Sequence, residues 1–365
     1  MEYREYKLKE IMYNFKYGTM PKKEKIKSFE EGKYPIYTGY LISGYYDECN
    51  IENETLIVVA RGVGGTGDVK LTTKKCFLTN LSIAMFNDEK IVSNKYLYYY
   101  FKIHNLRYLD SGSAQSQITI NDLKNVKVPV PKRDIQDKIV KILSQLDIKI
   151  KLNNQINDNL FELGDTLYKE YYSKYENELP NGYKYLNLND VSVNYDSKRK
   201  PMSSREREQH KGEYPYYGAT SIIDYVDDYI FDDTYLLMGE DGTVKTAEGY
   251  PVLQYIWGKN WINNHAHVLQ GTIISTEHLM FALRKKNIEA LITGAVQPKI
   301  NQVNMNKIKI IIGTDDVNKK FEEEIKVIVA KIKVNLIENE TLTQIRDTLL
   351  PKLMNGEIDL GKIEI

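Results

Sequence analysis

The sequence contains little cysteine, no long apolar run and no excess of either charge. Only Cys49 and Cys76 occur among the 365 residues, so we expect no disulfide framework, and a reducing cytoplasm is the expected location. The N-terminal segment lacks the apolar stretch of a secretory signal. The apolar run Leu56–Ala60 is far too short to cross a bilayer, so no membrane association is expected.

The balanced charge and the missing catalytic motifs narrow the possible functions. Lysine and arginine number 50, as do aspartate and glutamate, which argues against a general polyanion binder but not against one with segregated charges. There is no phosphate-binding loop and no Asn/Asp-Pro-Pro-Tyr/Phe methyltransferase motif. The glycine-rich stretch Arg61–Gly67 has neither the lysine nor the following helix that phosphate binding requires, and it predicts a tight hairpin turn.

The acidic residues and histidines of the second half give no complete metal or nuclease site. Asp232, Asp233, Glu240 and Asp241 lack the lysine that normally follows an acidic pair in metal-dependent nucleases. Histidines 265, 267 and 278 have no cysteine nearby and are interpreted as structural or DNA-facing. We therefore expect no metal, no bound cofactor and no catalytic residue in this chain.

Most of the chain occurs twice, at an offset of about 180 residues. Asp165-Thr166-Leu167 returns as Asp347-Thr348-Leu349, and Gly112–Ile118 returns loosely as Gly294–Ile300. A repeat of this length is a duplicated domain with its following helix, not a solenoid unit.

The repeat predicts an α+β fold with two globular α/β-mixed domains. We expect the first domain at residues 1–131 and a long spacer helix at 132–178, then the second domain at 179–313 and a second helix with the C-terminal tail at 314–365. Two such helices joined through a domain should pack antiparallel as a coiled coil, which places the domains around a pseudo-twofold axis.

The two helix predictions rest on apolar spacing. From Asp134, the expected N-cap, to Tyr172 there is no proline, and apolar residues follow steps of four and three. The predicted heptad seam contains Ile135, Ile139, Ile142, Leu146, Ile156, Leu160, Leu163 and Leu167. Only Lys149 and Asn153 interrupt it, matched by Lys331 and Asn335 in the helix from Asp316 to Leu350. These polar residues either fix the register of the pairing or face solvent.

Basic side chains and tyrosines gather at matching places in both halves. There are 29 tyrosines, and several lie beside basic turns, where flat side chains with a hydroxyl suit a binding surface. The basic clusters are Lys16, Lys22, Lys23, Lys25, Lys27 and Lys33, and then Lys198, Arg199, Lys200, Arg205, Arg207 and Lys211. A solvated loop is the alternative, because glutamates are interleaved.

Short motifs occur in the same order in both halves. They are Tyr34-Pro35 to Gly39 with Tyr214-Pro215 to Gly218, Leu56–Gly62 with Tyr235–Gly242, Phe77–Asn80 with Trp261–His267, and Gly112–Ile118 followed by Val126–Pro131. Together they resemble the specificity subunit of type I restriction-modification systems over essentially the whole chain. The second half departs from the family in reading Ile310–Gly313, without the terminal proline pair.

The resemblance implies a DNA-recognition subunit without catalysis of its own. Each domain would read one half of a split, asymmetric target in double-stranded DNA, and the helices would set the spacing. In this family the subunit recruits two methyltransferase subunits, which use S-adenosylmethionine to methylate adenine N6, and also motor-nuclease subunits. The sequence leaves open whether this chain has a restriction partner.

Candidate DNA-contacting residues follow from the preference of Arg, Lys, Asn and Gln for base edges and phosphates. We predict Lys22, Lys23, Arg61 and Gln115 in the first domain, and Arg199, Lys200, Asp241 and Lys299 in the second. For Arg61 an ion pair within the turn is the alternative. For the chain as a whole, the alternatives are a nuclease with an unrecognised site and a coiled-coil scaffold whose domains bind protein or glycan.

Overall fold

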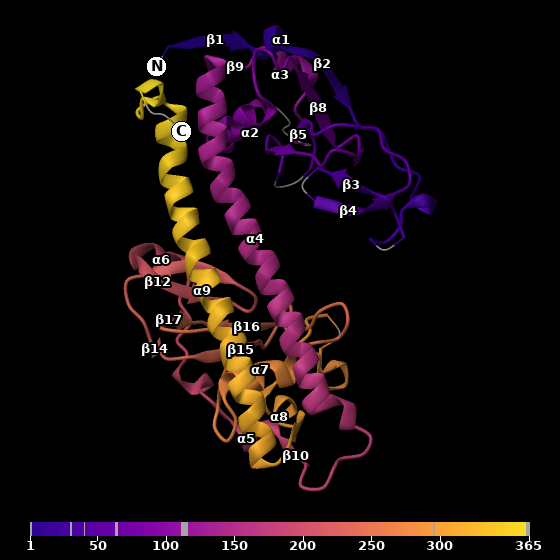
Figure 1. The fold of residues 1–365 in the computed structure, drawn as a ribbon, viewed down its shortest axis with the longest axis vertical. Helices are drawn as coiled ribbons and strands as arrows, with labels where there is room; N and C mark the ends of the chain where they lie inside the picture. The colour runs from indigo at the N-terminus through magenta and orange to yellow at the C-terminus, as the bar shows by residue number, and fades with distance from the viewer. Residues whose placement is uncertain are drawn as a thin grey trace. The chain divides into compact units, whose positions relative to one another are not determined.

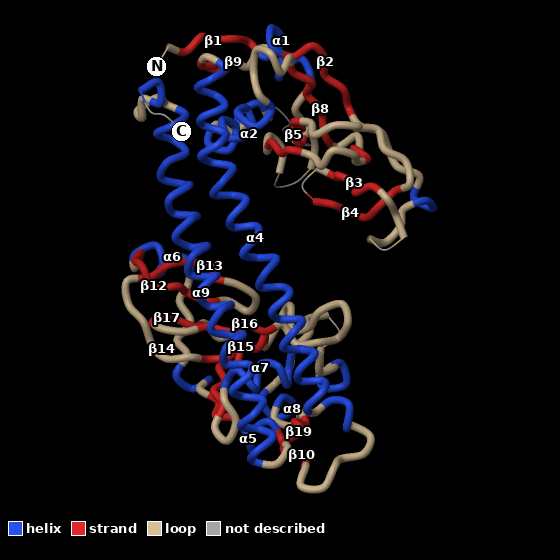
Figure 2. The backbone as a smooth tube through the Cα atoms, in the orientation of Figure 1, coloured by secondary structure: helices blue, strands red, loops and turns tan. Residues whose placement is uncertain are grey.

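The computed structural model describes residues 2–29, 31–39, 41–62, 65–110, 116–294 and 296–362, and it divides into two units. The first unit comprises residues 1–151 and 338–365, and the second comprises residues 152–337. Each unit mixes short strands, helices and long loops (Figure 2). The first unit therefore contains both ends of the chain.

The first unit carries its strands ahead of the first long helix (Figure 1). Its elements are β1 (Tyr3–Lys7), α1 (Leu8–Ile11), β2 (Met12–Tyr17), η1 (Lys23–Lys25), β3 (Tyr34–Thr38), β4 (Leu41–Tyr46), β5 (Leu56–Val59), β6 (Val69–Leu71), β7 (Phe77–Leu78), β8 (Ser82–Asn87), α2 (Asn94–Ile103), η2 (Arg107–Leu109), α3 (Ile120–Lys124), β9 (Lys127–Pro131) and α4 (Arg133–Tyr171).

The second unit repeats this order between α4 and α9. Its elements are η3 (Ser173–Tyr175), β10 (Lys184–Asn187), α5 (Leu188–Val191), β11 (Ser192–Asn194), η4 (Asp196–Lys198), α6 (Ser204–Gln209), β12 (Lys211–Tyr217), β13 (Ile222–Val226), β14 (Phe231–Asp232), β15 (Tyr235–Gly239), β16 (Leu253–Ile256), β17 (Lys259–Ile262), β18 (Ala266–Gly271), α7 (Thr276–Arg284), η5 (Glu289–Leu291), α8 (Gln302–Met305), β19 (Lys309–Ile312) and α9 (Asp315–Met354); η6 (Leu360–Lys362) follows in the first unit.

The sheets confirm the internal repeat. The antiparallel order β2-β8-β5-β6 returns as β11-β18-β15-β16, and the pair β1-β9 returns as β10-β19. A third sheet, β4-β3-β7, returns as β13-β12-β17 with β14 added at its edge. The buried strand predicted at Leu56–Ala60 is β5, which pairs antiparallel with β6. Of the turn predicted between them, Val63 and Gly64 lie outside the described residues. The predicted fold class, two α/β-mixed domains with two long helices, is confirmed.

The two long helices pack antiparallel within each unit (Figure 1). In the first unit Arg346 of α9 donates to Asp147 of α4 at 2.9 Å, and the Tyr99 hydroxyl of α2 donates to the same carboxylate at 2.7 Å. In the second unit, Asn335 Nδ2 donates to Asn157 Oδ1 at 2.8 Å. In each unit, therefore, a segment of α4 contacts a segment of α9.

The heptad seam predicted for α4 is wrong in its second half. Ile156 and Leu163 are exposed, whereas Asn153, Asn157 and Tyr168 are buried. The buried positions advance by more than 3.5 residues per turn, so they leave the heptad stripe as the straight helix proceeds. Asp134 also lies inside the first turn, because the helix begins at Arg133. There its negative charge interacts favourably with the positive end of the helix dipole.

The polar residues that interrupt the predicted seam either fix the register of the helix pairing or face solvent, and the structure shows both cases. Asn153 and Asn335 are buried in the helix pairing, which favours the interpretation that they fix register. Lys149 is half-exposed and forms an ion pair with Glu338 at 3.3 Å, and Lys331 is exposed. The lysines therefore face solvent.

The single glycine of α4 is explained by close packing in the second unit. A Cβ at Gly164 would lie 2.2 Å from the ring of Phe281, so any larger residue would push α7 away from α4. Next to it, Arg284 of α7 donates to both oxygens of Asp165, at 2.9 and 3.3 Å. Glycine and aspartate together fix α7 against the helix.

Candidate nucleic-acid interface

Each unit has a corner where a buried central strand ends in a turn. The first corner (Arg61, Gly62 and Gln117) follows β5, and the second corner (Asp241, Gly242 and Lys299) follows β15. Gly62 and Gly242 have positive φ values of 130° and 74°, a conformation that favours glycine. A Cβ on either would meet nothing within 4 Å, so backbone conformation and not space requires glycine.

The two corners share a backbone hydrogen bond and an antiparallel bridge. The Ile118 N–H donates to the Ala60 carbonyl at 2.9 Å, and the Ile300 N–H donates to the Glu240 carbonyl at the same distance. The next residues form isolated antiparallel bridges, Arg61 with Gln117 and Asp241 with Lys299. One scaffold therefore presents an arginine and a glutamine in the first unit, and an aspartate and a lysine in the second.

At the first corner the arginine is exposed, and the described residues give it no acidic partner. The Arg61 guanidinium carbon lies 6.0 Å from the centre of the Tyr17 ring. No carboxylate within the described ranges forms an ion pair with Arg61, so the structure does not support the alternative of an ion pair in the turn. The Gln117 backbone is fixed separately, because its N–H donates to Asp110 at 2.9 Å.

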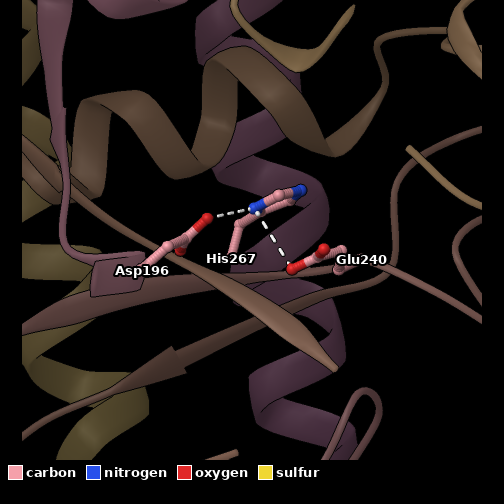
Figure 3. Close-up of side chains that lie close together, drawn as sticks. All are labelled: Asp196, Glu240 and His267. Carbon is pink, nitrogen blue, oxygen red and sulfur yellow. Dashed lines mark hydrogen bonds and ion pairs between the residues drawn. The ribbon is translucent and has the colours of Figure 1, made fainter. Parts of the chain in front are cut away.

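At the second corner a buried charged network lies beneath the turn. We define it as Asp196, Arg199, Glu240 and His267. Figure 3 shows three of these side chains, Asp196, Glu240 and His267. His267 is 1% exposed, with its Nδ1 2.5 Å from Asp196 and 3.7 Å from Glu240. Its Nε2 lies 2.9 Å from the Ile300 carbonyl oxygen. Because both ring nitrogens face acceptors, the contacts are satisfied together when both carry hydrogen.

The cations of the second corner meet the remaining carboxylate oxygens. Arg199 Nη1 lies 2.7 Å from Glu240 Oε2 and also donates to the Ala266 carbonyl at 2.6 Å. Lys299 Nζ lies 3.1 Å from Glu240 Oε1. Asp196 accepts a further bond from the Val268 N–H at 2.8 Å. The network thus ties η4, the turn after β15 and β18 into one block.

The same contacts set the protonation of the two largely buried carboxyl groups, Asp196 and Glu240. Burial by itself would raise the pKa of Asp196, but the hydrogen bond and charge of His267 outweigh burial and leave that pKa lowered. Burial likewise opposes ionisation of Glu240, and Arg199, His267 and Lys299 together hold its pKa below the usual value. Both groups therefore stay ionised at neutral pH.

Ligand atoms of Asp196, Glu240 and His267 lie within 4.8 Å of one another, a spacing that a metal ion could use. In this structure, however, the guanidinium of Arg199 and the ammonium of Lys299 already neutralise Glu240, and both histidine nitrogens are engaged. The donor set fits an ion-pair network better than a cation site.

The remaining predicted residues lie apart from the corners. Lys22 and Lys23 are exposed at η1, where the Lys22 N–H donates to the Tyr46 hydroxyl at 3.4 Å. Lys200 is exposed, and its carbonyl accepts a bond from the Trp261 indole at 2.6 Å. Gln115 lies outside the described residues.

The structure brings Arg199, Asp241 and Lys299 together at the second corner, and it adds His265. The exposed His265 ring lies with its Nδ1 2.7 Å from Asp241 Oδ1. Gln117 and Tyr17 join Arg61 at the first corner. Sequence reasoning did not select Gln117 as a contact, although it matches Lys299 in the repeat.

Two segments of the chain, residues 1–162 and 180–345, match the family described as "Type I restriction modification DNA specificity domain". The chain is 33% identical over 126 residues to a Haemophilus influenzae protein named putative type I restriction enzyme specificity subunit S.HindORF215P. That match covers 34% of this chain and 32% of the relative. Identity to the MjaIX specificity subunit of Methanocaldococcus jannaschii is 23% over 309 residues, covering 74% of this chain and 71% of the relative.

A solved structure has the same fold. The crystal structure of the type I restriction-modification system S subunit from M. genitalium superimposes with a TM-score of 0.64 at 21% identity. The comparison covers 97% of this chain and 96% of the other. In the described part of the chain, no helix has the length and apolar character needed to cross a membrane.

Proposed function

Because this chain belongs to the type I restriction modification DNA specificity family, with two specificity domains, we propose that each unit reads one half of a bipartite, asymmetric target in double-stranded DNA. One observation carries the proposal. The two corners share a backbone hydrogen bond and an antiparallel bridge but present different polar side chains, Arg61 with Gln117 and Asp241 with Lys299. Similar backbones with different side chains suit two different half-sites.

The chemistry of the corners suits base edges in the major groove. Arginine donates to guanine, glutamine pairs with adenine, and a carboxylate accepts from an amino group. Lys22, Lys23 and Lys200 are exposed and suit phosphate contacts, which position a protein on DNA without reading sequence. Arg199 is held by Glu240 and by three backbone carbonyls, so its role is to support the second corner.

The two helices would set the spacing between half-sites. Both α4, with 39 residues, and α9, with 40, run without a break from one unit into the other. A continuous helix rises about 1.5 Å per residue and resists bending, which makes it a suitable spacer.

The helices also leave apolar side chains without a partner in the described structure. On α4 of the second unit, Leu152, Ile156 and Leu163 are exposed, and on α9 Val327 and Val334 are exposed. We assign this apolar helix surface to the docking of two methyltransferase subunits. S-adenosylmethionine would bind to those partners and not to this chain, which would catalyse no reaction itself. A motor-nuclease subunit would join the same complex where restriction occurs.

Single-molecule sequencing of adenine methylation tests the function directly. Cells would carry this chain with its neighbouring methyltransferase, and cells with the gene deleted would be the control. We expect one split motif that disappears on deletion. An unchanged methylation pattern, with the methyltransferase present and active, would overturn the proposal.

A further inference from the structure

At the second corner, one oxygen of the Asp241 carboxylate has no hydrogen-bond partner among the described residues. Asp241 is 20% exposed, and one of its oxygens lies 2.7 Å from Nδ1 of His265. No other side-chain hydrogen bond or ion pair of Asp241 occurs within the described ranges, so the second oxygen is available. Next to it, the side chain of Lys299 is 48% exposed.

An ionised carboxylate only accepts hydrogen bonds, so it selects partners that donate. In the major groove the base-edge donors are the amino groups of cytosine N4 and adenine N6. Adenine also presents N7, an acceptor beside its amino group, which would face the carboxylate charge unfavourably. Cytosine is therefore the better partner for Asp241.

We propose that Asp241, oriented by His265, reads an exocyclic base amino group, preferably that of cytosine, at one position of the second half-site, and that the buried network positions it. This proposal rests on the proposed function. His265 bonds one oxygen of the carboxylate and leaves the other for a base. The base contact would belong to Asp241, and His265 acts through it.

The network fixes the chain at the residue before Asp241. Glu240 precedes it, and the Glu240 N–H donates to the His265 carbonyl at 2.8 Å. Beneath the turn, Glu240 is held by Arg199 at 2.7 Å and lies 3.7 Å from His267. Because these directional contacts hold Glu240 in place, the backbone position of the next residue, Asp241, is fixed as well.

The network also allows Lys299 to leave its partner at low cost. Glu240 accepts from both Arg199 and Lys299, and the latter is the exposed one. When Lys299 turns to a phosphate or base, Glu240 keeps the charge of Arg199 and the neighbouring His267. Lys299 is therefore the movable contact of this corner, and Arg199 is the fixed one.

The first unit has no such network at the matching positions. The aligned strands place Tyr17, Ala60 and Ile83 where the second unit has Asp196, Glu240 and His267. Ala60 and Ile83 are fully buried and apolar. Disturbing the network should therefore alter recognition by one unit only.

The test uses the chain in complex with its methyltransferase and a DNA library randomised at each position of the wild-type target. The variant Asp241→Asn keeps the size of the side chain but adds a donor. We expect its discrimination at one position of one half-site to fall by about 10-fold, as for the loss of a good base contact. Libraries with cytosine or adenine at that position distinguish the two possible amino donors.

Glu240→Gln tests the positioning role, because it preserves shape and removes the charge. We expect it to relax the same position, with unchanged selection in the other half-site. Arg61→Gln is the matched control, since it should alter the other half-site alone. Thermal unfolding of each variant shows whether the fold is retained.

Three results would overturn the proposal, and they differ from one another. If the wild type has no split target, the proposed function itself fails. If the split target exists and Asp241→Asn leaves both halves unchanged, only this assignment fails. If Asp241→Asn or Glu240→Gln weakens binding to every DNA equally, the corner has a structural role and no part in base reading.

Discussion

Arg61 and Lys23 represent two kinds of basic side chain in the first unit. Arg61 stands at a corner with a fixed backbone and an aromatic neighbour, whereas Lys23 lies in a short 3₁₀ turn on the surface. A side chain with a fixed origin can discriminate between bases, and a long flexible side chain on a loop can follow any phosphate. The two residues should therefore respond differently to substitution.

We expect Arg61→Ala to relax recognition at one position of the first half-site, with a loss of about 1–3 kcal/mol in discrimination there. Lys23→Ala should weaken binding to all sequences and reduce the slope of log affinity against log salt by about 1. Binding measured across a DNA library at several salt concentrations separates the two. If Arg61→Ala weakened binding to all DNA sequences equally, Arg61 would be assigned as a phosphate contact.

The sequence predicted the two turns, whereas the contacts of the side chains near them became visible only in the structure. Arg61, Asp241 and Lys299 lie at the corners, because a glycine after a buried strand marks a turn. Sequence could not show that Arg199 is committed to Glu240, since the two are far apart in the chain. Gln117, which matches Lys299 in the repeat, lies at the first corner, whereas Gln115 lies outside the described residues.

A buried histidine should make the stability of the second unit depend on pH. His278 of α7 is fully buried against Tyr172 and Phe321, and its Nδ1 lies 3.3 Å from Glu322. Burial lowers the pKa of His278 below the ordinary 6.5, although Glu322 opposes the shift. The unfolded chain therefore gains a proton at a higher pH than the folded chain does.

Stability should accordingly fall as the pH decreases below about 6.5, and it should level off below the folded pKa of His278. Denaturant unfolding at several pH values between about 7.5 and 5 measures this. We expect His278→Gln to flatten the dependence in that window. An equal slope in the variant and the wild type would assign the pH dependence to other groups, such as Glu322, whose pKa is also lowered and whose effect appears at lower pH.

At the scale of elements, the positions of the helices were easier to predict than their faces. The predicted helices match α4 and α9 to within a few residues at their ends, because proline-free apolar spacing over such a length has few other solutions. The seam was assigned by a heptad rule, and it placed Ile156 and Leu163 inside. Both are exposed, and the buried residues of this part of α4 include Asn153, Asn157 and Tyr168 instead.

The exposed apolar residues of α4 lead to a prediction about assembly. We expect the double substitution Ile156→Gln and Leu163→Gln to weaken co-purification with the methyltransferase, since apolar burial there would be lost. The free chain should remain folded, because both side chains are already exposed. Lys151→Gln, on the same helix, is the control. Undiminished binding by the double variant would place the docking surface elsewhere.

At the scale of the whole molecule, the first unit is built from both ends of the chain. Leu350, Leu353 and Met354 of α9 are buried in the same core as Leu8, Val128 and Ile139. The Tyr3 hydroxyl also donates to the Leu353 carbonyl at 3.3 Å. The second helix follows the second domain in sequence, but it ends in the core of the first unit.

This arrangement determines which unit a substitution near the C-terminus should destabilise. Leu353 is 1% exposed, so Leu353→Ala should cost about 2–5 kcal/mol by leaving a cavity. We expect hydrogen exchange to increase in β1, β9 and α2 of the first unit, although Leu353 follows the whole second unit in sequence. Phe321→Ala, in the same helix but in the other core, should instead increase exchange in α7 and β18. If Leu353→Ala loosened the second unit and left the first protected, the division of α9 between two cores would be wrong. If both variants loosened both units equally, the long helices would couple the two cores into a single folding unit.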